Sequence, residues 1–204
     1  MTYKNYPFIV IEGLDGVGKS TAVQGVADML GGRVCSSPSE NMKALKHIFH
    51  EADVGLRTQY YELCNAEFSS SLPTLLSHST IICDRYVAST TAADLAFGSI
   101  DSIDFTQRLE DFKWPSNCEV PDLTIHLTLD EDVRKSRIVQ RGEGKDRFEA
   151  AIEKETFRNR HTTVYSYLSD IDLDITGMSP HEVVYSILEI IALSGLFPKM
   201  EALT

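Results

Sequence analysis

The chain has 204 residues, of which 43% are hydrophobic and 24% charged, and its formal net charge is −11. This length favours one domain with a full hydrophobic core, and the composition is that of an ordinary soluble globular protein. The acidic balance argues against non-specific binding to nucleic acids or membrane surfaces.

The cysteines show neither a CxxC pair nor zinc-ligand spacing. We interpret all four as free, mostly buried thiols of a reducing compartment. The N-terminus lacks the apolar core of a signal peptide, and no apolar run approaches the ~20 residues that a membrane span needs. We therefore expect a cytoplasmic protein without a membrane span. The cysteines are Cys35, Cys64, Cys83 and Cys118.

Apolar runs of strand length alternate with longer helical patterns along the whole chain. The strands are continuous apolar runs, as expected when helices cover both faces of a sheet. This alternation predicts an α/β protein of three layers, with a five-stranded parallel sheet between helices. We expect strands at residues 8–11, 33–36, 80–83, 123–129 and 172–175. We expect helices at residues 20–30, 41–50, 56–76, 103–112, 131–140, 149–168 and 180–193. Helical patterns also follow the third strand and continue through residue 97.

A glycine-rich stretch, EGLDGVGKST, follows the first predicted strand and precedes the first helix. It fits the phosphate-loop pattern G-x-x-x-x-G-K-[ST], in which backbone N–H groups surround phosphate oxygens at a helix N-terminus. Lys19 would reach the β and γ phosphates of a nucleoside triphosphate, and the Ser20 hydroxyl would bind Mg²⁺. The predicted phosphate contacts are Gly13, Asp15, Gly16, Gly18, Lys19, Ser20 and Thr21.

A second polar signal, Asp84-Arg85-Tyr86, ends the third predicted strand. An acidic residue at the carboxyl end of a central strand points into the ligand crevice of an open α/β sheet. Asp84 could there hold Mg²⁺ or its waters beside the phosphate loop. The planar fork of donors on Arg85 suits a second phosphate group.

A third signal is basic and runs from residue 134 to residue 149. Arg134, Arg137 and Arg141 share one helical face, and RGEGKDRFE follows with two glycines. We interpret residues 141–149 as a lid whose Arg141, Lys145 and Arg147 close over the triphosphate. The phosphate loop has no basic residue between Asp15 and Gly18, so a transition-state arginine is expected from this lid.

These motifs together resemble the thymidylate kinase family of nucleoside monophosphate kinases over nearly the whole chain. The resemblance rests on FIVIEGLDGVGKST, DRYVAST, the RGEGKDRFE segment and the final helix. It implies one phosphate-loop kinase domain over residues 1–204, acting as a homodimer. It also implies transfer of the γ-phosphoryl group of Mg·ATP to a pyrimidine deoxynucleotide, typically dTMP to dTDP.

The resemblance also implies roles for individual residues. Asp15 would meet the 3′-hydroxyl of the acceptor sugar, and Arg85 would hold the acceptor phosphate. Asp84 would position Mg²⁺, and residues 174–179 would border the adenine. Since a phosphate acceptor is already anionic, positioning and charge neutralisation suffice and no strong general base is required.

Two segments depart from the family pattern. The loop SSPSENMK lacks the arginine that the family places near the acceptor phosphate. The family also tends to place an aromatic residue four positions before an arginine, and this pair aligns with Tyr61 and Asn65 here. Tyr61 could stack on the base, and Asn65 could hydrogen-bond it. Both departures are similar to the mitochondrial UMP/CMP kinase of the same fold, which keeps another pyrimidine acceptor open.

Three other classes fit the sequence less well. A deoxynucleoside kinase would need a carboxylate base directly after the second strand, where residues 33–38 have none. A GTPase-type switch would need N-K-x-D and DxxG motifs, which do not occur. A non-catalytic nucleotide-binding subunit would not need Lys19, Ser20, Asp84 and Arg85 intact.

Overall fold

The structure is a computed structural model that describes residues 5–49, 52–141 and 147–197, without the side chains of residues 147–149. Its sheet has five parallel strands in the order β2-β3-β1-β4-β5, which confirms the predicted architecture. The strands are β1 (Phe8–Glu12), β2 (Arg33–Ser36), β3 (Ile81–Asp84), β4 (Leu123–Thr128) and β5 (Ile171–Asp174).

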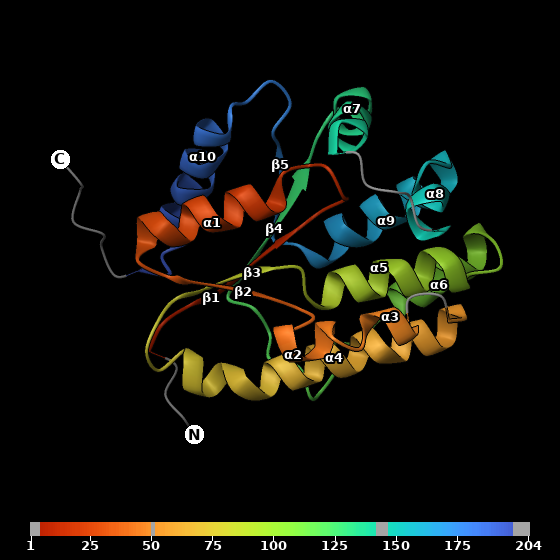
Figure 1. Cartoon of the computed structure of the whole chain (residues 1–204), viewed down its shortest axis with the longest axis horizontal. Helices are drawn as coiled ribbons and strands as arrows, with labels where there is room; N and C mark the ends of the chain where they lie inside the picture. The colour runs from red at the N-terminus through yellow and green to blue at the C-terminus, as the bar shows by residue number, and fades with distance from the viewer. Residues whose placement is uncertain (1–4, 50–51, 142–146, 198–204) are drawn as a thin grey trace.

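Helices cover both faces of this sheet (Figure 1). On one side lie α1 and α10, which pack against each other, and on the other side lie α4 and α5. The helices are α1 (Lys19–Leu30), α2 (Glu40–Lys43), α3 (Lys46–Phe49), α4 (Val54–Leu75), α5 (Val87–Gly98), α6 (Ser102–Glu110), α7 (Glu131–Arg141), α8 (Arg147–Ile152), α9 (Glu155–Leu168) and α10 (Pro180–Leu193).

Alternate residues of β1 face the two helical layers, because successive side chains of a strand point to opposite faces. Ile9 and Ile11 belong to the hydrophobic cluster that includes α1 and α10. Phe8 and Val10 belong to the cluster formed with α4. β1 is therefore buried on both faces, and the loop that follows it starts from a fixed position.

Two predicted helices are each divided in the structure. The helix predicted at residues 41–50 is instead α2 and α3, with a turn at Ala44 and Leu45, and residue 50 lies outside the described residues. Residues 149–168 are interrupted before Glu155, where Lys154 has an extended backbone. The Arg158 guanidinium lies 3.4 Å from the Ile152 carbonyl and 3.1 Å from the Glu153 carbonyl. A side chain thus satisfies carbonyls that a continuous helix would have bonded internally.

Candidate active site

The site lies at the carboxyl ends of β1 and β3, which are neighbours in the sheet. Residues 13–18 connect β1 to α1, and three glycines in this loop have positive φ angles: Gly13 at 141°, Gly16 at 89° and Gly18 at 107°. A Cβ atom on Gly13 would lie 2.6 Å from the Leu127 carbonyl oxygen. Both the backbone conformation and the close neighbours therefore require glycine here.

Lys19 begins α1 and is buried, with Nζ donating a hydrogen bond of 2.8 Å to the Leu14 carbonyl oxygen. Burial, with the nearby charge of Arg85, lowers the pKa of Lys19 to about 8. The side chain folds back over its own loop, so its ammonium group is held against the loop backbone. This arrangement suits an anionic ligand, whose charge would favour the protonated amine.

Ser20 and Asp84 lie beside this loop, with Ser20 Oγ donating to Asp84 Oδ2 at 2.7 Å. The other carboxylate oxygen, Oδ1, is buried and has no hydrogen-bond partner in the described part of the chain. A hydroxyl and a carboxylate with a spare oxygen fit Mg²⁺, which binds few protein ligands and takes the rest from water and substrate phosphates. Across the described residues, no cluster of three His, Cys, Asp or Glu side chains could hold a metal ion by itself.

Arg85 follows Asp84 in a strained conformation, with φ of 70°. Its guanidinium pairs with Asp15 Oδ1 at 2.5 Å and donates to Ser89 Oγ at 2.9 Å and the Tyr165 hydroxyl at 3.2 Å. The charge of Arg85 holds the pKa of Asp15 well below its usual value, against the opposing effect of burial. Asp15 is therefore a carboxylate at neutral pH and a poor general base.

Glu12 fixes the turn that carries Arg85. This fully buried carboxylate accepts hydrogen bonds from the N–H groups of Tyr86 and Ser89, at 2.8 and 3.2 Å, and from Ser89 Oγ at 2.6 Å. It thereby satisfies the first N–H groups of α5 from the neighbouring strand. Glu12 was not predicted as a functional residue, although an acidic residue directly before the glycine-rich loop was a visible signal.

Arginines of α7 brace the phosphate loop from outside. Arg134, 3% exposed, donates to the Asp15 carbonyl oxygen at 2.8 Å, and Arg137 donates to the Val17 carbonyl oxygen at 3.0 Å. The shared helical face noted in the sequence is thus present. At these two positions it contacts the loop backbone, and Arg137 also lines the cavity beside Gly16 and Gly18.

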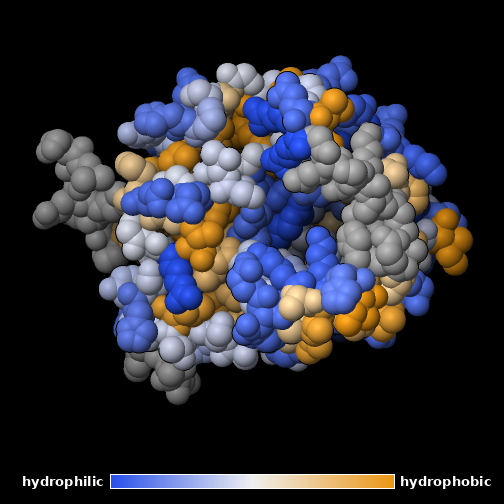
Figure 2. Space-filling view, in the orientation of Figure 1, coloured by the Kyte–Doolittle hydropathy of each residue, from blue (hydrophilic) through white to orange (hydrophobic). Residues whose placement is uncertain are grey.

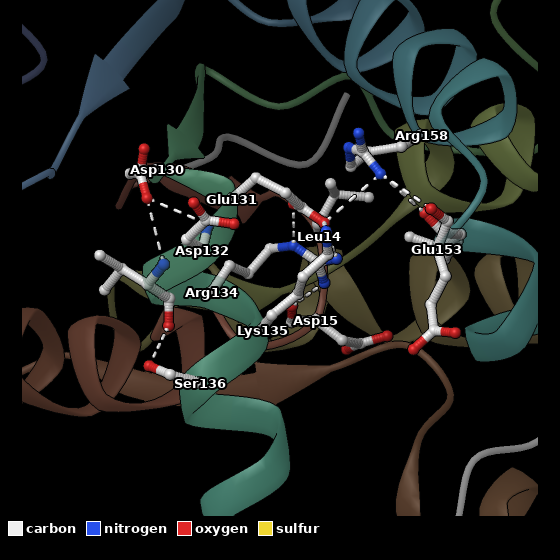
Figure 3. A network of polar contacts seen from close by, with 12 residues as sticks. Leu14, Asp15, Asp130, Glu131, Asp132, Arg134, Lys135, Ser136, Glu153 and Arg158 are labelled. Carbon is white, nitrogen blue, oxygen red and sulfur yellow. Dashed lines mark hydrogen bonds and ion pairs between the residues drawn. The ribbon is translucent and has the colours of Figure 1, made fainter.

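Glu131 joins this brace to the start of α9 (Figure 3). Its carboxylate accepts two hydrogen bonds from Arg134, at 2.7 and 2.9 Å, and lies 3.4 Å from Arg158. Burial acts to raise the pKa of Glu131, but the hydrogen bonds and charges of Arg134 and Arg158 outweigh it and lower that pKa. One ionised carboxylate therefore connects the phosphate loop with the α8–α9 junction.

Two cavities meet at the phosphate loop. We call the first, of about 410 Å³, the acceptor cavity; Asp15, Arg85, Tyr61 and Thr90 are among its walls. The second, of about 400 Å³, we call the donor cavity; Gly16, Gly18, Thr21 and Arg141 are among its walls. In Figure 2 a hollow opens near the middle of the molecule, and the surface around it is mainly hydrophilic.

Parts of residues 174–179 and of the predicted lid line the donor cavity. Ile175 and Met178 line it, next to Pro180 and Val183 of α10. Arg141, at the end of α7, lines it and is exposed. Arg147 begins α8, but its side chain is outside the described part of the structure. Lys145 lies outside the described residues.

Tyr61 and Asn65, which align with the pair that recognises the base in the family, differ in their position relative to the acceptor cavity. Tyr61 lines the acceptor cavity. Asn65 is 3% exposed and is not part of the wall: its Oδ1 accepts from Ser37 Oγ at 2.5 Å, and its Nδ2 donates to Thr90 Oγ1 at 2.9 Å. Asn65 thus fixes two hydroxyl groups that do line the cavity.

Sequence analysis missed Arg57, which lines the acceptor cavity one helical turn before Tyr61. Its guanidinium carbon lies 5.5 Å from the centre of the Tyr61 ring. The signal was the i, i+4 spacing, which places both residues on one face of α4. An arginine and an aromatic residue are thus present together, in the reverse order along the helix.

No helix in the described ranges is long and apolar enough to cross a membrane.

Comparisons with known proteins agree with this geometry. A family model described as thymidylate kinase matches residues 11–176. The chain is 30% identical to the thymidylate kinase of Leptospira borgpetersenii over 196 residues, which cover 90% of this chain and 92% of that protein. It is 28% identical to the mitochondrial UMP-CMP kinase 2 of Homo sapiens over 191 residues, which cover 91% of this chain but 42% of that protein.

Solved structures give the same fold. The thymidylate kinase from Candida albicans superposes with a TM-score of 0.73 at 23% identity, covering 94% of this chain and 93% of that one. A shikimate kinase from Acinetobacter baumannii superposes with a TM-score of 0.62 at 13% identity, covering 95% and 97%. At these identities the likeness shows the fold alone.

Proposed function

The chain belongs to the thymidylate kinase family of ATP-dependent nucleoside monophosphate kinases, and from that premise we propose that it phosphorylates a pyrimidine nucleoside monophosphate, dTMP first, to the diphosphate. The observation that carries the proposal is the meeting of two cavities at one phosphate loop. Gly16 and Gly18 line the donor cavity, while Asp15 of the same loop lines the acceptor cavity with Arg85.

We assign the triphosphate of ATP to the loop from Gly13 to Thr21. Lys19 would neutralise its terminal phosphates, and the loop N–H groups would bind their oxygens. Ser20 and Asp84 would hold Mg²⁺, which supplies further neutralisation of phosphate charge when bound. These residues orient the donor and do not themselves form bonds to phosphorus.

Arg85 would hold the acceptor phosphate, with Tyr165 and Ser89 fixing its guanidinium. An oxygen of that phosphate attacks the γ-phosphorus of ATP, the bond from the γ-phosphorus to the bridging oxygen breaks, and ADP leaves with the electron pair. The attacking oxygen is anionic near neutral pH, so no proton has to be removed first. Asp15, paired with Arg85, would meet the 3′-hydroxyl of the sugar.

The lid and the dimer complete the proposal and rest on the sequence and the family. Arg141, Lys145 and Arg147 would bring positive charge to the transferring group when residues 141–149 close. Closure would also exclude water and suppress wasteful hydrolysis of ATP. We propose one domain over residues 1–204, acting as a homodimer.

A second candidate is a UMP/CMP kinase, and Asn65 is the observation that favours it. The residue aligned with the thymine-reading arginine is buried and bonded to Ser37 and Thr90, so base recognition falls to those hydroxyls, to Arg57 and to stacking on Tyr61. The similarity to mitochondrial UMP-CMP kinase 2 supports the same candidate.

The test is Mg·ATP turnover against dTMP, dUMP, UMP, CMP, dCMP, AMP, GMP and thymidine. The highest kcat/KM for dTMP would establish the first candidate, and the highest value for UMP or CMP the second. Preference for thymidine would overturn both in favour of a nucleoside kinase.

A second test is the variant Lys19→Ala, which removes a positive charge from the phosphate loop. We expect kcat to fall on the order of 10²–10³-fold, as for loss of one preorganised stabilising group. A variant that keeps a tenth of the wild-type kcat would refute the assigned role of Lys19.

A further inference from the structure

His161 is a buried histidine in the wall of the acceptor cavity that no step above uses. It lies on α9, its side chain is 4% exposed, and its ring packs edge-on against Phe97 with centroids 5.7 Å apart. Its Nδ1 lies 2.9 Å from the Phe157 carbonyl oxygen. Since a carbonyl can only accept, Nδ1 carries the hydrogen.

The other ring nitrogen, Nε2, is then a lone-pair acceptor. Burial, with a smaller effect from the charge of Arg85, lowers the pKa of His161 to about 4, so the ring is neutral at neutral pH. Nε2 has no hydrogen-bond partner among the described residues, and Phe157 holds the opposite edge of the ring. The cavity wall therefore contains a fixed, uncharged acceptor.

The charged groups around this cavity are mainly donors: Arg85, Arg57, Lys43 and Lys46 line it together with Asp15. Those cations suit phosphate and carbonyl oxygens, which cannot donate to Nε2. A ligand group facing His161 must instead be a neutral donor. Among the parts of a nucleotide that lie next to its phosphate, the sugar hydroxyls have this property.

The position of His161 along α9 agrees with a sugar contact. Tyr165, whose hydroxyl contacts Arg85, lies one helical turn further along the same helix. Four residues correspond to about 6 Å along a helix axis. His161 is thus one turn away from the position assigned to the acceptor phosphate, as the sugar of a bound nucleotide would be.

We propose that His161 Nε2 accepts a hydrogen bond from a hydroxyl of the acceptor sugar other than the one that donates to Asp15, since each hydroxyl has a single hydrogen to donate. His161 is then a specificity-determining residue for the sugar. This inference rests on the proposed function. It predicts that an acceptor lacking the contacted hydroxyl binds less well, because a buried acceptor then stays unpaired.

The experiment compares UMP, dUMP and 3′-deoxyuridine monophosphate as acceptors for the wild-type enzyme and two variants. H161N keeps a donor for the Phe157 carbonyl but has no atom at the position of Nε2. H161Q can place an amide oxygen near that position. We expect the wild type to lose about tenfold in kcat/KM when the contacted hydroxyl is missing, the worth of one buried hydrogen bond.

We expect H161N to lose about tenfold on the acceptors that carry the hydroxyl, and nothing further on the analogue that lacks it. H161Q should recover part of that loss. Equal losses on all three acceptors would indicate a packing role and overturn the proposal. So would a wild-type enzyme that does not distinguish the three, a result that needs no variant to fold.

Failure of this inference is distinct from failure of the proposed function. A wild-type enzyme that phosphorylates no pyrimidine monophosphate would overturn the proposed function. If the wild-type enzyme phosphorylates all three acceptors, and the ratios of kcat/KM between them are the same in H161N, only the role of His161 is overturned.

Discussion

Lys19 is buried within the phosphate loop, where its amine donates to the Leu14 carbonyl and its pKa is lowered to about 8. Below pH 8 the enzyme without ATP therefore carries the positive charge that the proposed ATP site requires, and above pH 8 it loses that charge. We expect kcat/KM for ATP to fall about tenfold per pH unit above 8, since this constant reports the enzyme before ATP binds. The measurement is a pH profile at saturating acceptor.

Bound phosphates favour the charged amine, so kcat should stay level to higher pH than kcat/KM does. Lys19→Arg provides the control, because a guanidinium does not titrate in this range. If the variant shows the same decline above pH 8 as the wild type, the titrating group is not Lys19.

Arg85 is held in place from three sides, by Asp15, Ser89 and Tyr165. Arg85→Ala removes the proposed partner of the acceptor phosphate. Hydrogen bonds to charged groups are worth roughly 1.5–3 kcal/mol, so kcat/KM for the acceptor should fall at least tenfold, with a higher acceptor KM. Steady-state kinetics with the best acceptor of the panel measures this loss.

Arg108→Ala is a suitable comparison for Arg85→Ala. Arg108 also pairs with an aspartate, Asp94 at 2.8 Å, but it does not line the acceptor cavity; it lines a neighbouring cavity that shares Thr58 and Thr90 with it. Its removal should leave the acceptor KM unchanged. An unchanged acceptor KM in Arg85→Ala would instead remove Arg85 from the acceptor site.

The residue types at the phosphate end were predictable from the sequence, while the base end was not. Lys19, Ser20 and Asp84 belong to local motifs whose spacing fixes their geometry. Whether Asn65 faces the cavity or the interior depends on Ser37 and Thr90, which are distant in the chain. No local pattern encodes such a contact.

At the scale of elements, α7 acts as a brace for the phosphate loop. Glu131→Gln keeps the shape of the side chain but removes the charge that holds Arg134 and Arg158. We expect kcat to fall roughly tenfold, because Arg134, which donates to the Asp15 carbonyl of the loop, loses a charged hydrogen-bond partner worth about 1.5–3 kcal/mol. Turnover at saturating substrates measures the change.

Asp132→Asn is the matched control, since Asp132 is the next residue of α7 and its side chain is exposed. It should leave kcat unchanged. A double-mutant cycle of Glu131→Gln with Arg158→Gln would give the coupling between α7 and α9. A coupling free energy of zero would mean that the two helices are braced independently.

The central strands β1, β3 and β4 were predictable because burial on both faces leaves continuous apolar runs. The division of residues 149–168 was not, because Arg158 satisfies the carbonyls of Ile152 and Glu153 by a side-chain contact that periodicity does not record. Helical patterns are local, whereas this interruption also depends on Glu131 in another helix.

For the molecule as a whole, His161 links acid stability to the acceptor cavity. Its pKa is about 4 in the folded chain and about 6.5 when unfolded, so between these values the unfolded chain binds the extra proton. The free energy of unfolding therefore falls as the pH falls through this window. Between pH 7 and pH 5 the loss from His161 should be about 2 kcal/mol.

Urea unfolding of wild type and H161N at a series of pH values measures this effect. The difference in stability between the two proteins should shrink by about 2 kcal/mol on acidification, because H161N lacks the titrating group. A difference that stays constant from pH 7 to pH 5 would show that His161 is not kept neutral by the fold.

The acceptor cavity is built from two kinds of structure. Asp15 and Arg85 follow adjacent strands of the sheet, whereas Lys43, Lys46 and Arg57 come from two short helices and α4. Under the proposed function, substitutions on those helices would change which base fits while the groups assigned to phosphoryl transfer stay in place. Descendants of one ancestor can thus exchange one pyrimidine for another, and relatives at 30% and 28% identity that are named for different acceptors are the expected outcome of such drift.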